Sequence, residues 1–123
     1  MSECELGAYL GHIVMAMDAI AEYIVGMRDE DFFNDRKTQD AVIRNCEIIG
    51  EAIKHVPADY RTLHPEVDWR GLAGLRDVLI HQYFGVDYMV VWQIAVTECP
   101  LYRTAIAALP EYKGLDSEAE SIR

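Results

Sequence analysis

Hydrophobic residues in the first half of the chain recur at intervals of three and four, the spacing of one face of an α-helix. Two such stripes predict long helices over residues 5–27 and 37–56. Acidic and polar residues at 29–31 and 34–35 separate them, so we expect antiparallel neighbours joined by a short polar turn, with Asp35 as cap of the second. The stripes are Leu10, Ile13, Met17, Ile20 and Ile24, then Val42, Cys46, Ile49, Ile53 and Val56.

The second half predicts shorter helices punctuated by proline and glycine. Pro57 ends the second helix, a connector follows, and Asp68 caps a helix over residues 69–83. Asp87 caps a fourth helix, in which Pro100 predicts a kink or break before a continuation over 101–109. No strand pattern, repeat or glycine-rich phosphate loop occurs in the sequence. We therefore expect an all-α, up-and-down bundle of four to five helices.

Gly50 interrupts the second stripe at a helix cost of about 1 kcal/mol relative to alanine. We expect that it lets another helix approach closely. The helical pattern predicts a single domain over residues 1–110, followed by an acidic, frayed tail over 111–123.

Composition indicates a folded, cytoplasmic protein. Half of the 123 residues are hydrophobic, which excludes a disordered chain. His12, Asp18 and Glu22 within the first helix argue against a membrane span, and no secretory leader opens the sequence. The three cysteines are widely separated and predict reduced thiols.

The formal net charge of −10 bears on possible partners. Residues 1–35 hold eight acidic and one basic residue, whereas residues 36–83 hold seven of each. Nonspecific binding to nucleic acid depends on phosphate neutralisation by Lys and Arg, so this chain should not grip RNA over a broad surface. If it cuts RNA, it must rely on a local cleft, low affinity or a delivered substrate. The charge is also compatible with binding no RNA at all.

Candidate chemistry gathers at residues 76–83, where Arg76, Asp77, His81 and Tyr83 stand in an otherwise apolar helix. In a continuous helix Arg76 and Tyr83 share a face, His81 lies about 140° round from Arg76, and Asp77 neighbours His81. Asp77 is thus able to orient the imidazole of His81. A purely structural alternative stays open. A histidine near a helix C-terminus often stabilises the helix dipole or makes a core hydrogen bond, and an arginine often caps a helix or extends its charged end from an apolar surface into water. Tyr83 also fits a buried tyrosine with one hydrogen bond.

Metal chemistry is not indicated by residue spacing. The four histidines form no H-E-x-x-H and no Glu-x-x-His pair, and Asp18 with Glu22 is one i, i+4 carboxylate pair of a kind common on solvated faces. We expect no metal and no cofactor.

The spacing Arg76, four residues, His81, one residue, Tyr83 resembles the R-x4-H-x-Y signature of HepT-type toxins of the HEPN superfamily. The resemblance runs from about residue 10 to 109, although many relatives carry Asn where this chain has Asp77. Further segments occur in the family's order: Ile49-Gly50-Glu51-Ala52, His64-Pro65, Trp69, Val86-Asp87 and Val91-Trp92.

The resemblance implies a metal-independent endoribonuclease toxin of a type VII toxin–antitoxin system. Arg76 would stabilise charge on the phosphate, and His81 would transfer protons, leaving a 2′,3′-cyclic phosphate and a 5′-hydroxyl. Because one chain supplies one such histidine, we expect a homodimer with paired motif helices. The resemblance also implies that a minimal nucleotidyltransferase antitoxin adds AMP to Tyr83. The alternative function is a non-catalytic helical partner of such a nucleotidyltransferase.

Overall fold

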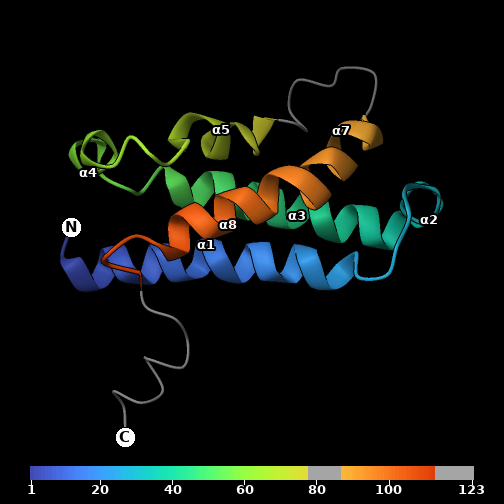
Figure 1. Cartoon of the computed structure of the whole chain (residues 1–123), viewed down its shortest axis with the longest axis horizontal. Helices are drawn as coiled ribbons and strands as arrows, with labels where there is room; N and C mark the ends of the chain where they lie inside the picture. Colours follow the sequence, from blue (N-terminus) through green and yellow to red (C-terminus); the bar gives the residue numbers. More distant parts are fainter. Residues whose placement is uncertain (78–86, 113–123) are drawn as a thin grey trace, which may run out of the picture.

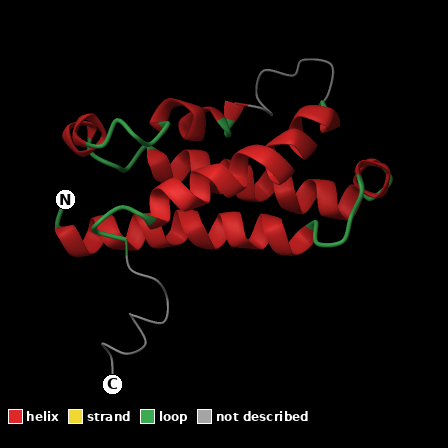
Figure 2. Ribbon diagram, viewed as in Figure 1, coloured by secondary structure: helices red, strands yellow, loops and turns green. Residues whose placement is uncertain are grey.

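The two apolar stripes form α1 (Glu3–Tyr23) and α3 (Arg36–Ile53), which lie antiparallel and side by side in a computed structural model of the chain (Figure 1). The structure describes residues 1–77 and 87–112. Every regular element in these two ranges is helical, and no strand occurs in them (Figure 2). The predicted all-α fold and the antiparallel pair are therefore confirmed.

The boundaries of α1 differ from the predicted residues 5–27 for local reasons. The helix begins earlier because the Ser2 hydroxyl accepts a hydrogen bond from the Glu5 N–H at 3.1 Å. It ends at Tyr23, three residues before Gly26, whose φ of 75° lies in the left-handed region. Gly26 thus provides the turn that reverses the chain.

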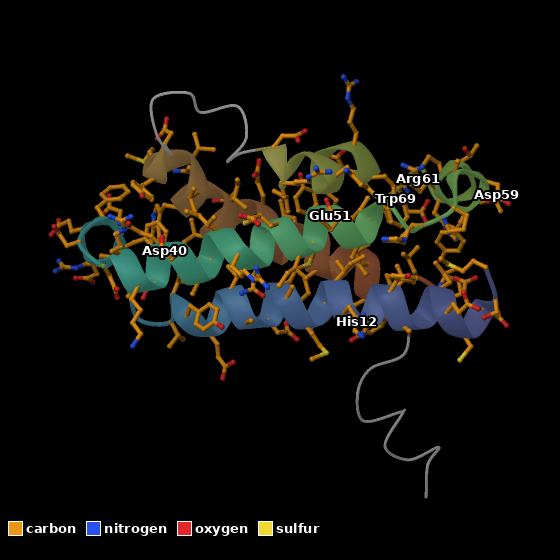
Figure 3. All side chains as sticks on the ribbon, turned by 180° about the vertical axis from the view of Figure 1, so that it is seen from behind. His12, Asp40, Glu51, Asp59, Arg61 and Trp69 are labelled. Carbon is orange, nitrogen blue, oxygen red and sulfur yellow. The ribbon has the colours of Figure 1, made fainter. Side chains whose placement is uncertain are left out.

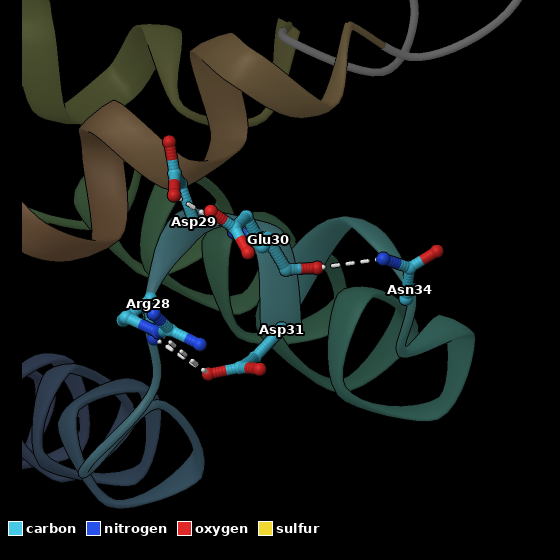
Figure 4. A network of polar contacts seen from close by, with 5 residues as sticks. All are labelled: Arg28, Asp29, Glu30, Asp31 and Asn34. Atoms are coloured by element: carbon cyan, nitrogen blue, oxygen red, sulfur yellow. Dashed lines mark hydrogen bonds and ion pairs between the residues drawn. The ribbon is translucent and has the colours of Figure 1, made fainter.

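The link between α1 and α3 contains a short helix, α2 (Asp29–Phe33), where the sequence predicted only a polar turn. Three acidic residues in its first turn suit the positive end of a helix dipole, and the Arg28 N–H donates to Asp31 Oδ2 at 2.9 Å (Figure 4). Phe32 is fully buried, with its ring centroid 5.2 Å from that of Trp92. The polar-turn prediction was wrong because the acidic flanks masked this single core residue.

The last helical stretch crosses α1 and α3 on one side, as three consecutive segments (Figure 1). These are α7 (Tyr88–Gln93), a π-helical turn η1 (Ile94–Glu98) and α8 (Cys99–Ala107). Asp87 caps α7 as predicted, accepting from the Met89 N–H at 3.0 Å. The disturbance expected at Pro100 is a π turn, which places Pro100 in the first turn of α8 where its missing N–H is tolerated.

Two short helices lie at the C-terminal end of α3 (Figure 1). The predicted connector contains α4 (Ala58–Leu63), and Asp68 caps α5 (Trp69–Gly74) by accepting from the Gly71 N–H at 2.9 Å. The helix predicted over 69–83 does not continue through Arg76. It ends at Gly74 and gives way to a turn at Leu75, whose N–H bonds back only three residues to the Leu72 carbonyl.

The core lies between α1, α3 and the α7–α8 stretch. Eight residues of α1 are buried, and its long apolar sequence also passes a length and composition test for a membrane span, as core helices do. The exclusion of a span from its polar residues stays a prediction. Cys46 and Cys99 are buried and Cys4 is exposed, all as free thiols. Residues 113–123 of the predicted tail lie outside the described ranges.

Candidate functional site

Arg76 lies in the turn after α5, directly against α3. A Cβ atom added to Gly50 of α3 would lie 2.6 Å from the Arg76 Cβ and 2.9 Å from its backbone nitrogen. The prediction that Gly50 permits a close helix approach is therefore confirmed, and the residue that approaches is Arg76 itself. A side chain at position 50 would displace this part of the candidate site.

The side chain of Arg76 is held by the next residue of α3. Its Nη1 lies 2.9 Å from Oε1 of Glu51, and the same carboxylate oxygen lies 3.7 Å from Lys54 Nζ. Figure 3 places Glu51 on the side of α3 beneath α5. The Arg76 side chain is 32% exposed and that of Glu51 54%, so the ion pair lies at the surface.

The turn that carries Arg76 is fixed by buried neighbours. Leu72 and Leu75 are almost fully buried, and Trp69, 8% exposed, donates from Nε1 to the His64 carbonyl at 2.9 Å. This bond links His64-Pro65 and Trp69, two of the segments that carried the family resemblance. Arg76 is thus positioned by a packed scaffold.

A polar contact from α8 also supports the start of α5. The Tyr102 hydroxyl donates to Asp68 Oδ2 at 3.5 Å, and burial together with the charges of Asp68 and Glu98 raises the pKa of Tyr102 to about 12. The phenol therefore keeps its proton at neutral pH. Asp68 both caps α5 and ties it to α8.

Of the other predicted site residues, the structure describes only Asp77. Asp77 is exposed and follows Arg76 directly. His81 and Tyr83 lie outside the described residues, so their distances from Arg76 and Asp77 stay predictions. The shared face predicted for Arg76 and Tyr83 stays a prediction, because Arg76 lies in a turn after α5 and Tyr83 lies outside the described residues.

Glu51 is a residue of this site to which sequence analysis gave no role. It stood in the segment Ile49-Gly50-Glu51-Ala52, next to the glycine expected to receive another helix. Its place beside Gly50 was the sequence feature that pointed to a role for Glu51, but nothing in the sequence paired Glu51 with Arg76. Among residues 1–77 and 87–112, no group of three His, Cys, Asp or Glu side chains is placed to hold a metal ion.

A second surface feature is an apolar groove between α1 and α3. Met15 and Ile48 are 47% and 39% exposed there, and Asn45 is buried at its floor. Ile48 lies about one turn before Glu51 on α3. It is lined by His12, Met15, Ala16, Ala19, Asn45 and Ile48.

Comparison with known proteins identifies the family. The family model described as "Ribonuclease HepT-like" matches residues 13–109. A Thermococcus cleftensis protein named "Probable ribonuclease HepT" is 50% identical over 92 residues, covering 75% of this chain and 84% of that protein. A Methanocaldococcus jannaschii protein named "Putative RNase" is 45% identical over 100 residues, covering 81% of this chain and 86% of that protein.

No solved structure matches the chain. The resemblance inferred from R-x4-H-x-Y is confirmed by the family match, which includes the whole motif from Arg76 to Tyr83. The chain belongs to the HepT-like ribonuclease family.

Proposed function

We propose that the chain is a metal-independent endoribonuclease toxin that acts as a homodimer. The observation that carries the proposal is the Arg76 of a HepT-like motif, anchored on α3 at the surface. A guanidinium has five N–H donors, and one carboxylate engages at most two of them. The others are available for the non-bridging oxygens of an RNA phosphate.

The proposed reaction is internal phosphoryl transfer. The 2′-oxygen attacks the phosphorus, the bond to the 5′-oxygen breaks, and a 2′,3′-cyclic phosphate and a 5′-hydroxyl form. A base removes the proton of the 2′-hydroxyl and an acid delivers one to the departing 5′-oxygen, with Arg76 stabilising the extra negative charge. Histidine serves either role near neutral pH, and each contributes about 10²–10⁴-fold.

One chain offers His81 alone for two proton transfers, so the proposed site needs a second copy. In a two-fold dimer with facing motif segments, one His81 acts as base and its partner as acid. The apolar groove supports this arrangement, since exposed Met15 and Ile48 adjoin the Glu51 side of α3. Asp77 is proposed to orient His81 from one turn away.

Regulation is proposed to act through Tyr83. A minimal nucleotidyltransferase would transfer AMP from ATP to the tyrosine oxygen, releasing pyrophosphate. The added phosphate and adenosine would neutralise Arg76 and occupy the space for RNA. A variant with Tyr83→Phe should stay active in the presence of the partner and ATP, whereas a wild-type protein gains the mass of AMP and loses activity.

The net charge of −10 favours a second candidate function, a non-catalytic partner of a nucleotidyltransferase, because it opposes RNA binding. Expression of the wild type without a partner separates the two. Growth arrest with 2′,3′-cyclic phosphate ends, lost in His81→Ala and Arg76→Ala, supports the nuclease.

Arg70→Ala is the matched control, since Arg70 is an exposed arginine of α5 outside the motif. If a folded wild type leaves no such RNA ends, the nuclease proposal is refuted.

A further inference from the structure

We propose that Glu51 is a positioning residue that orients the Arg76 guanidinium for the scissile phosphate. The inference rests on the proposed nuclease function and assigns a role within that site. Glu51 does not touch the reacting atoms in this scheme. It acts through Arg76.

Two consecutive residues of α3 place both ends of Arg76. Gly50 receives the Arg76 backbone, with the close approach that only a missing side chain allows. Glu51 receives the guanidinium, at 2.9 Å between Oε1 and Nη1. Both the origin and the direction of a long, flexible side chain are thereby determined, which reduces the rotamer freedom lost when a phosphate binds.

The ion pair between Glu51 and Arg76 is poorly suited to a purely stabilising role. Glu51 is 54% exposed and shares its carboxylate with Lys54, and exposed ion pairs contribute little to folding stability. A pair that joins α3 to the turn after α5 nonetheless favours one direction of the Arg76 guanidinium. Orientation is therefore its larger effect.

The charge of Glu51 has the wrong sign to attract RNA. Glu51 is a negative charge beside the group that should bind an anion, so it weakens the attraction of the site for RNA. A residue kept there for orientation should raise turnover without improving affinity. Loss of Glu51 should therefore lower kcat and leave KM unchanged or lower. Because a partly unfolded enzyme also loses kcat at constant KM, the variant must be shown to be folded under the assay conditions.

The experiment compares Glu51→Gln and Glu51→Ala with the wild type on a short RNA, using kcat, KM and thermal unfolding. Gln keeps an oxygen at the reach of the Glu carboxylate and can still accept from Nη1, whereas Ala cannot. We expect kcat to fall about 10- to 100-fold in Glu51→Ala and less in Glu51→Gln, with KM not raised. Asp40→Asn is the control, because Asp40 is an exposed acid of α3 paired with Arg36, and its loss changes the net charge equally.

A second measurement does not depend on activity. Relaxation of the Arg76 side-chain ¹⁵Nε signal should report an ordered guanidinium in the wild type and Asp40→Asn and a mobile one in Glu51→Ala. Unchanged order, or wild-type kcat in Glu51→Ala, would overturn the inference while leaving the nuclease intact. A raised KM at constant kcat would also overturn it.

A failure of the proposed nuclease function gives a different result from a failure of the proposed role of Glu51. A folded wild type that does not cleave RNA refutes the nuclease and, with it, the role of Glu51 in catalysis.

Discussion

Replacing Gly50 by alanine should damage activity far more than stability. The new Cβ would lie 2.6 Å from the Arg76 Cβ, whereas carbon atoms in contact are normally about 3.5–4.0 Å apart. Arg76 or α3 must therefore move by about 1 Å. A displacement of this size at a group that must contact the substrate, as is proposed for Arg76, costs roughly 100-fold in rate.

The stability change is the difference of two opposing effects. Alanine improves helix propensity by about 1 kcal/mol, and overpacking costs about 1–3 kcal/mol. We therefore expect the free energy of unfolding to fall by roughly 0–2 kcal/mol. Urea denaturation measures this change, and cleavage of a short RNA by the folded fraction measures the rate.

Gly74→Ala provides the matched control. Gly74 ends α5 two residues before Arg76, and a Cβ there would meet no atom of residues 1–77 or 87–112 within 4 Å. This variant should keep full activity and gain up to about 1 kcal/mol of stability. If Gly50→Ala behaved in the same way, the close packing of Arg76 on α3 and the reasoning built on it would be refuted.

Two further predictions test the fold around the site. Phe32→Ala should lower the free energy of unfolding by about 3–5 kcal/mol, because Phe32 is fully buried; a loss below about 1 kcal/mol in denaturant titration would contradict a core role for α2. Burial raises the pKa of Cys46 and of Cys99 to about 12, so these thiols stay protonated from pH 7 to 9. A chromogenic disulfide reagent should then react rapidly with Cys4 alone in that range and with all three thiols in denaturant; rapid reaction of a second thiol in the folded protein would contradict the packing between α3 and α8.

Local sequence signals predicted the elements that depend on local physics. The caps Asp35, Asp68 and Asp87 were correct, because a short polar side chain before a helix bonds to nearby N–H groups whatever the remainder of the chain does. The long helices were predicted for a similar reason, since a stripe at helical spacing can be buried on one side only as a helix. Phe32 was missed, because two adjacent phenylalanines among acidic residues show no periodicity that would tell the buried one from the exposed one.

The sequence by itself determined the helical architecture, the family and the presence of Arg76, His81 and Tyr83 in one motif. It also determined that Gly50 would meet another segment. Only the tertiary structure decided that this segment is the Arg76 turn and that Glu51 pairs with its guanidinium. The physical reason is that periodicity specifies which face of a helix is buried, whereas the residue found opposite depends on how separate elements pack.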